Sequence, residues 1–339
     1  MNKLLSYYTS LFGTSGSEGD IRRAILNEIS PHATTKVDKL GNIIAFKKGR
    51  YEPPATVMLS AHMDEVGMIL TSVTEDGYIR FDTVGGIDPR TLCGKHVAIG
   101  RRKIPGVIGQ MAPHLMKKSE KDVIKKTDEL FIDIGARDRD DALQYVQLGD
   151  VIGFRSDYAE FGDGLVRAKA LDDRAGCQIL TNLIKKDLPF DTYFAFTVME
   201  EIGCIGAGCA AFELKPDYSV VVEGTTAADI SDNKSSSSVC RVGGGPVISF
   251  MDGSTIYDRD FIKLACAAAV ERGIPYQMKQ AVAGGNDSGR IQRTASGTAA
   301  LSISVAVRYL HTVTGVASLD DIDNTERLVY AVLNKMLNV

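Results

Sequence analysis

Apolar residues follow one another without interruption in several segments of this chain, and each such segment ends in polar or charged residues. The runs cover residues 55–61, 193–199, 218–222 and 299–307. Continuous Val, Ile and Leu runs that alternate with helical patterns are typical of strands buried on both faces of a sheet. We therefore predict an α/β fold with helices on both faces of a sheet. The predicted helices cover residues 20–30, 173–186, 258–272 and 321–337.

Between residues 67 and 167 the pattern changes to short alternating segments, broken by Gly, Pro or charged clusters. These segments cover residues 67–72, 78–81, 95–100, 107–110, 130–134 and 151–154. Such spacing is typical of an all-β unit. The polar ends of the flanking runs must meet to form one site. We therefore predict an inserted, small β-barrel-like domain at 67–167 that interrupts a catalytic domain made of 1–66 and 168–339.

Six residues with metal-binding or acid–base side chains lie at, or just beyond, the ends of predicted strands or the start of a predicted helix. They are His62, Asp172, Glu200, Glu201, Glu223 and His311. In open α/β sheets, ligands bind beyond the carboxyl ends of the strands. Buried charges are normally paired or bound to metal. Two imidazoles with several carboxylates favour Zn, Co or Mn over Ca or Mg.

Five protein ligands with one bridging carboxylate fit a dinuclear metal pair, which leaves one carboxylate for proton transfer. The pattern alone does not assign these roles among the six residues. Asp64, two residues after His62, is a further candidate of the same neighbourhood.

Composition restricts the function further. The 339 residues are 44% hydrophobic, enough for a full core and a second, smaller one. A net charge of −4 does not favour binding to nucleic acid, which is itself negatively charged. No stretch reaches membrane-spanning length, so no membrane partner is expected. The six cysteines are scattered among apolar residues, which predicts reduced thiols and a cytoplasmic protein.

Five stretches of the chain resemble metallopeptidase family 42, the glutamyl or tetrahedral aminopeptidases. They lie at residues 61–67, 85–90, 170–176, 198–203 and 309–311, in the family's order and with its spacing. The resemblance covers nearly the whole chain. It implies a mixed-sheet, zinc-peptidase-like catalytic domain, in which the inserted domain serves oligomerisation or substrate access.

The resemblance also implies roles for the candidate residues. Asp172 bridges two divalent ions, Zn or Co first and Mn as a further possibility. His62 and Glu223 complete one metal site, and Glu201 and His311 complete the other. Glu200 is the general base, Asp64 holds the imidazole of His62, and the bond between Asp172 and Asp173 is a cis peptide.

Two departures from the family pattern stand near the predicted site. Position 223 is Glu where many relatives carry Asp. Asn286 and Ser288 lie in a loop that usually reads Thr-Asp-Ala. We expect both departures to affect the shape of the metal site or of the substrate site.

The predicted function is a metal-dependent aminopeptidase that uses a metal-bound hydroxide to remove N-terminal residues from short peptides. Arg290 and Arg293 have two interpretations: charges on a helix surface, which is the favoured one, and a positive pocket that would select acidic N-terminal residues, Glu or Asp. The resemblance further implies a homo-oligomer in which dimers assemble into a tetrahedral dodecamer. Three alternatives remain: a deacylase or carboxypeptidase on the same core, a glycosidase such as the family members labelled endoglucanases, and a non-enzymatic metal-binding protein.

Overall fold

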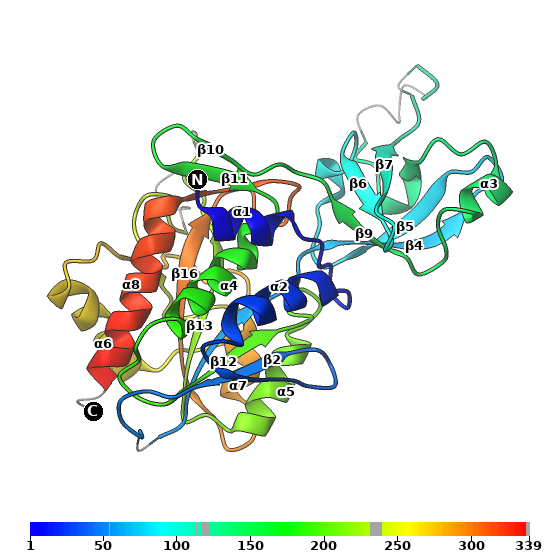
Figure 1. The fold of residues 1–339 in the computed structure, drawn as a ribbon. Coiled ribbons are helices and arrows are strands. Elements are labelled where there is room, and N and C mark those ends of the chain that lie inside the picture. Colours follow the sequence, from blue (N-terminus) through cyan, green and yellow to red (C-terminus); the bar gives the residue numbers. More distant parts are fainter. Residues whose placement is uncertain (54, 113, 117–122, 231–238, 337–339) are drawn as a thin grey trace.

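The chain folds into a larger part built on a mixed sheet and a smaller β-barrel that projects from it (Figure 1). The structure is a computed structural model that describes residues 1–53, 55–112, 114–116, 123–230 and 239–336. The strands of the eight-stranded sheet, in spatial order, are β1 (Thr34–Val37), β2 (Ile43–Lys47), β12 (Thr192–Thr197), β3 (Val57–His62), β13 (Tyr218–Thr226), β16 (Ala299–Val307), β14 (Val247–Ile248) and β15 (Gln277–Met278).

The four central strands β12, β3, β13 and β16 run parallel and are buried on both faces. Their side chains alternate between two cores. In β13, Val220 and Val222 pack into the larger core, whereas Val221 packs into a smaller core on the opposite face. All four predicted runs are strands of this sheet, which confirms the predicted α/β fold.

Helices cover both faces of the sheet, as predicted. The helices that pack into the larger core are α1 (Lys3–Ser10), α2 (Gly19–Ile29), α4 (Leu171–Ile184), α6 (Arg259–Glu271) and α8 (Leu319–Met336). The helices on the opposite face are α5 (Ile205–Leu214) and α7 (Asp287–Gln292). The four predicted helices correspond to α2, α4, α6 and α8. The sequence pattern did not predict α5. This helix contains two glycines and is apolar on nearly all sides, so its apolar residues do not alternate with polar ones at the period of a helix.

The inserted unit is a closed antiparallel barrel with its own apolar core, and all six predicted segments are its strands. In closed order they are β4 (Gly67–Val73), β5 (Ile79–Val84), β8 (Phe131–Asp133), β7 (Ile104–Gly109), β6 (His96–Ile99) and β9 (Val151–Phe154). Short helical segments beside them are η1 (Pro89–Thr91), η3 (Thr127–Glu129) and α3 (Arg139–Leu143).

The chain returns from the barrel through a small antiparallel sheet. Its strands are β10 (Ala159–Phe161), β11 (Leu165–Ala168) and β17 (Gly315–Ser318), so the returning segment pairs with the C-terminal part of the chain. The domain limits at 66 and 168 stay a prediction. Among the described residues, no helix is both long and apolar enough to span a bilayer.

Candidate metal centre

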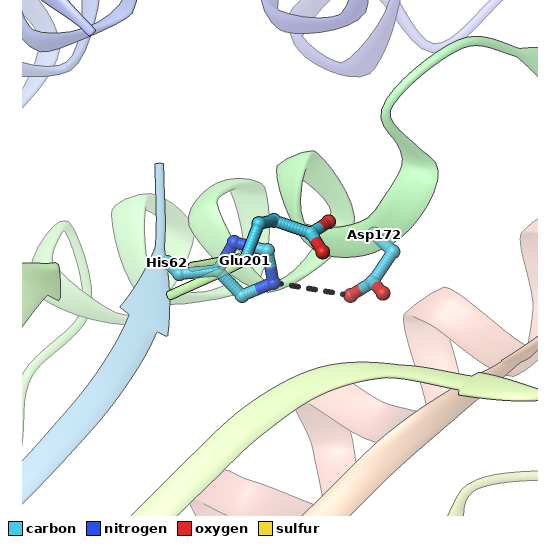
Figure 2. A group of neighbouring side chains, drawn as sticks. All are labelled: His62, Asp172 and Glu201. Carbon is cyan, nitrogen blue, oxygen red and sulfur yellow. Dashed lines mark hydrogen bonds and ion pairs between the residues drawn. The ribbon is translucent and has the colours of Figure 1, made fainter. Parts of the chain in front are cut away.

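The predicted site residues converge beside the carboxyl ends of the central strands. His62 is the last residue of β3, Asp172 lies in the first turn of α4, and Glu201 follows β12 (Figure 2). The His62 Nε2 atom lies 3.3 Å from the Asp172 Oδ1 atom. One ligand atom from each of these three residues lies within 4.8 Å of the others, so the group could hold a metal ion.

His311, beyond the end of β16, approaches the same aspartate from another direction. Its Nε2 atom lies 3.1 Å from Glu201 Oε2 and 3.9 Å from Asp172 Oδ2. The two imidazoles therefore face different oxygens of Asp172. A carboxylate with one histidine nitrogen near each oxygen is suited to bridge two cations.

The remaining nitrogen of each imidazole faces a protein oxygen. His62 Nδ1 lies 3.2 Å from the carbonyl of Asp64 and 3.4 Å from its Oδ1, and His311 Nδ1 lies 3.0 Å from the carbonyl of Gly86. A proton on Nδ1 leaves the lone pair of Nε2 free for a metal, which is the usual arrangement of ligating histidines. The donor set therefore fits divalent metal. Asp64 was predicted in this position, whereas Gly86 was only part of the 85–90 motif.

The carboxylate of Asp64 also organises the loop after β12. It is fully buried, and its Oδ1 accepts the Glu200 backbone N–H at 3.0 Å. Its Oδ2 accepts the Glu201 N–H at 3.1 Å and the Ser15 hydroxyl at 2.6 Å. One carboxylate thus fixes both the histidine and the two consecutive glutamates, so a change at Asp64 would displace all three.

Glu223 requires a correction to the predicted position. The sequence pattern ends its strand at 222, but β13 continues to Thr226 because its pairing with β16 continues to Val307. Glu223 therefore lies inside the strand and not beyond its end. Its side chain lines a cleft of about 460 Å³ that is also lined by His62 and Asp172.

The two departures from the family pattern meet in this cleft. The Asn286 side-chain amide donates to Glu223 Oε1 and also to the hydroxyl of Tyr257, 3.0 Å away. Asn286 is in addition the N-cap of α7, because its Oδ1 accepts the Ser288 N–H at 2.7 Å. The side chains at the two departures, Glu223 and Asn286, are therefore joined by a hydrogen bond.

Gly224 permits the close approach of Asp172 to β13. Its N–H donates to Asp172 Oδ1 at 3.0 Å, and a Cβ atom at 224 would lie 2.8 Å from the carboxylate carbon. The bond between Asp172 and Asp173 is cis, as the resemblance implied. Asp173 then turns inward, where its carboxylate accepts the N–H groups of Gly176 and His62.

Burial disfavours the ionised form of the carboxylates in this group. It is the main cause that raises the pKa of Glu200 to about 8 and the pKa values of Glu201 and Glu223 well above the usual range. Repulsion from Asp172 adds to the effect. For His62, burial alone would lower the pKa, but the hydrogen bonds to Asp172 and Asp64 outweigh it and raise the pKa. A cation among these groups would relieve the repulsion.

The cleft contains a basic residue that the sequence pattern did not reveal. Among the described residues that line it, Lys279 is the one lysine or arginine. It is 6% exposed, and its Nζ donates to the Ala283 carbonyl at 2.8 Å. Arg290 and Arg293, for which a substrate pocket was the alternative to helix-surface charges, do not line the cleft. Lys279 follows the two-residue strand β15, which is too short to show a period.

The chain is similar in sequence to known proteins over nearly its whole length. Residues 41–328 match the M42 glutamyl aminopeptidase family. A protein of Acetivibrio thermocellus is 39% identical over 332 residues, which are 97% of each chain. The lysyl aminopeptidase of Pyrococcus furiosus is 29% identical over 96% of this chain and 94% of its own.

Solved structures agree with the fold. A TET aminopeptidase from the marine sediment archaeon Thaumarchaeota archaeon SCGC AB-539-E09 has a TM-score of 0.94 at 30% identity, covering 99% of this chain and 98% of its own. The TET1 peptidase of Pyrococcus horikoshii, which can assemble into a tetrahedron or a large octahedral shell, has a TM-score of 0.85 at 33% identity, covering 97% and 98%.

Proposed function

Since this chain belongs to the M42 glutamyl aminopeptidase family, we propose that it is a metal-dependent aminopeptidase that acts on short peptides. The observation that carries the proposal is the approach of two imidazole Nε2 atoms to the two oxygens of one aspartate, Asp172. A glycosidase would have no use for these two imidazoles, because glycoside hydrolysis needs only two carboxylates.

The residues that would hold metal are His62, Asp172, Glu201, Glu223 and His311. When bound there, two divalent ions, Zn or Co first and Mn as a further candidate, would supply Lewis-acid activation of water and of the scissile carbonyl. Asp64 keeps the His62 ring and the Glu200–Glu201 loop in place through the hydrogen bonds described above.

Glu200 is the proposed general base. It lines the cleft beside His62 and Asp172 and is not needed among the five ligands. Its carboxylate would take a proton from the attacking water and then pass it to the leaving amine. Burial already raises its pKa to about 8, and neighbouring cations would lower that value towards neutrality. A base with a pKa near the working pH transfers protons efficiently in both directions.

The proposed substrates carry an acidic N-terminal residue, Glu or Asp, and Lys279 is the feature that supports this preference. Its ammonium group uses one N–H on Ala283, so two further donors are available to a carboxylate in the cleft. One relative is a lysyl aminopeptidase, so the preferred N-terminal residue differs between members of the family. The residues that line the cleft of each protein must therefore determine which N-terminal residue it prefers.

We expect Lys279→Met to lower kcat/KM for glutamyl-anilide relative to leucyl-anilide by roughly 10–150-fold, the worth of one hydrogen bond to a charged group. Arg293→Met is the matched control, because Arg293 is exposed and does not line the cleft, and its ratio should stay at the wild-type value. An unchanged ratio in Lys279→Met would remove Lys279 as the specificity residue.

Self-assembly is part of the proposal. The TET1 peptidase with the same fold forms tetrahedral or octahedral shells. We infer that this chain forms a homo-oligomer, with a tetrahedral dodecamer as the proposed state and the barrel as the proposed contact. A closed shell of this kind would admit only short, flexible peptides. We also propose a cytoplasmic location, supported by the reduced thiols of Cys177 and Cys204.

The direct test is reconstitution of metal-stripped protein with Zn, Co or Mn. Hydrolysis of aminoacyl-anilides should vanish on stripping and return with two metal equivalents per chain, while N-acyl amino acids and cello-oligosaccharides should stay intact. Light scattering on the same samples reports whether the particle mass is a multiple of the 36.6 kDa chain. Full peptidase activity without metal, or chelator-insensitive release of sugar, would contradict the proposal.

A further inference from the structure

A second group of ligand atoms shares Glu200 with the proposed catalytic centre. One ligand atom each from Glu200, Cys204 and Asp287 lies within 4.8 Å of the others. The group is formed by a turn after β12, in which the N–H groups of Gly203 and Cys204 both donate to the Glu200 carbonyl at 2.9 Å. This turn places the residue at 204 beside the side chain of Glu200.

The thiol is in direct contact with the proposed base. Cys204 Sγ lies 3.4 Å from Glu200 Oε1. In a tetrahedral zinc site with Zn–S of about 2.3 Å and Zn–O of about 2.0 Å, a sulfur and an oxygen ligand lie about 3.5 Å apart. The observed separation is therefore already the one that two ligands of the same ion require.

Asp287 supplies an independent sign that a ligand belongs here. It is 2% exposed, at the first residue of α7. Its Oδ2 accepts the Thr197 hydroxyl at 2.6 Å, but its Oδ1 is buried without a hydrogen-bond partner. A buried carboxylate oxygen left in this condition is costly, and a bound cation is one of the partners that would satisfy it.

We propose that Cys204, Glu200 and Asp287 form a third, inhibitory site for a soft divalent cation such as Zn²⁺. One sulfur with two carboxylate oxygens favours zinc over the hard ions Ca²⁺ and Mg²⁺. On binding, the Cys204 S–H bond breaks, its proton leaves to solvent, and a Zn–S bond forms without any change of oxidation state. Cys204 is partly exposed, so an ion from solvent can reach the site.

The consequence for activity rests on the proposed function. A Glu200 carboxylate that is engaged with a cation cannot accept a proton from water, so occupation of this site stops hydrolysis even when the catalytic ions are in place. Excess zinc would then inhibit the enzyme that stoichiometric metal activates.

Spectroscopy tests the site without reference to activity. Full-length protein is titrated with Co²⁺, because thiolate coordination gives a near-ultraviolet charge-transfer band that histidine and carboxylate ligands do not give. We expect the band in the wild type and its loss in Cys204→Ala. Cys209→Ala removes an exposed thiol of α5, the helix that begins directly after Cys204, so it is the matched control and should keep the band.

Removal of an oxygen ligand should weaken the same band. Asp287→Asn is expected to raise the Co²⁺ concentration for half-maximal absorbance by at least roughly tenfold, the lower end of the loss seen when a metal's supporting groups are removed. Absence of the band in the wild type at every Co²⁺ level, or an equal band in Cys204→Ala, would overturn the proposed site.

Inhibition tests the link to Glu200. The ratio of peptidase activity at excess zinc to that at stoichiometric zinc is measured within each variant. Half-inhibition should require at least roughly tenfold more zinc in Cys204→Ala than in the wild type or Cys209→Ala. Equal inhibition in all three would refute the inhibitory role. If the chain hydrolysed no peptide at all, the proposed function would fail, and the cobalt band would still decide the cation site.

Discussion

Glu200→Gln is expected to lower kcat by roughly 10²–10⁴-fold, the usual contribution of a positioned general base. The glutamine keeps the shape of the side chain, and the backbone N–H of residue 200 can still donate to Asp64. It cannot accept the proton of the attacking water. The five proposed metal ligands are untouched, so elemental analysis at stoichiometric loading should find the metal content of the wild type.

A matched control separates loss of the base from disturbance of its loop. Ile202 lies in the same loop, is 45% exposed and is not among the residues that line the cleft. Ile202→Ala should therefore keep kcat within about twofold of the wild type, because surface changes away from special features have small effects. Near-normal turnover in Glu200→Gln would remove Glu200 as the base, whatever the control shows.

Glu65→Gln is expected to lower the free energy of unfolding by roughly 3–5 kcal/mol, the cost of removing one partner from a buried ion pair. Glu65 is 3% exposed and lies between two buried cations. Lys169 Nζ contacts both of its carboxylate oxygens at 2.7 Å, and Arg174 Nη2 lies 3.3 Å from Oε1. Arg174 is fully buried and also donates to backbone carbonyls of Met63 and Tyr8.

The loss in Glu65→Gln should depend on pH with a defined sign. Burial lowers the pKa of Lys169 from 10.5 to about 8, and Glu65 is the group that opposes this shift. Between these values the unfolded chain binds more protons than the folded one, so stability rises with pH. In the variant the unpaired Lys169 can be deprotonated. Without its carboxylate partner, Lys169 has a folded-state pKa below the wild-type value of about 8, so the stability deficit should shrink as the pH rises towards about 8 and stay constant from there to 10.5.

Chemical denaturation at several pH values measures this effect. Glu75→Gln is the control, because Glu75 pairs with Arg139 at 2.9 Å on the surface, where the two side chains are 85% and 50% exposed. That change should cost less than about 1 kcal/mol at every pH. If Glu65→Gln and Glu75→Gln had equal effects, the buried network would contribute no more than a surface pair.

The catalytic candidates could be found from the sequence because they follow continuous apolar runs. His62, Glu200 and His311 follow long apolar runs, and such runs predict buried strands whose carboxyl ends share one edge. The barrel strands were found in the same way, from alternation between turns. Glu223 shows the limit of this reasoning. The strand of Glu223 continues through polar residues because it pairs with β16. A run of apolar residues in the sequence does not show how far two strands pair.

The sequence by itself determined the helices and strands and the side chains available for chemistry at one edge of a sheet. It did so because the apolar and polar residues of each strand show whether that strand is buried. Only the tertiary structure decided which distant side chains meet. Lys169 and Glu65 are 104 residues apart, and Asp287 and Thr197 are 90 apart. No local period links such pairs, because their contact depends on how helices α4 and α7 pack against the sheet. The buried ion network and the place of Lys279 in the cleft beside His62 are contacts of this kind, whereas Cys204 and Glu200 are four residues apart and meet through a local turn.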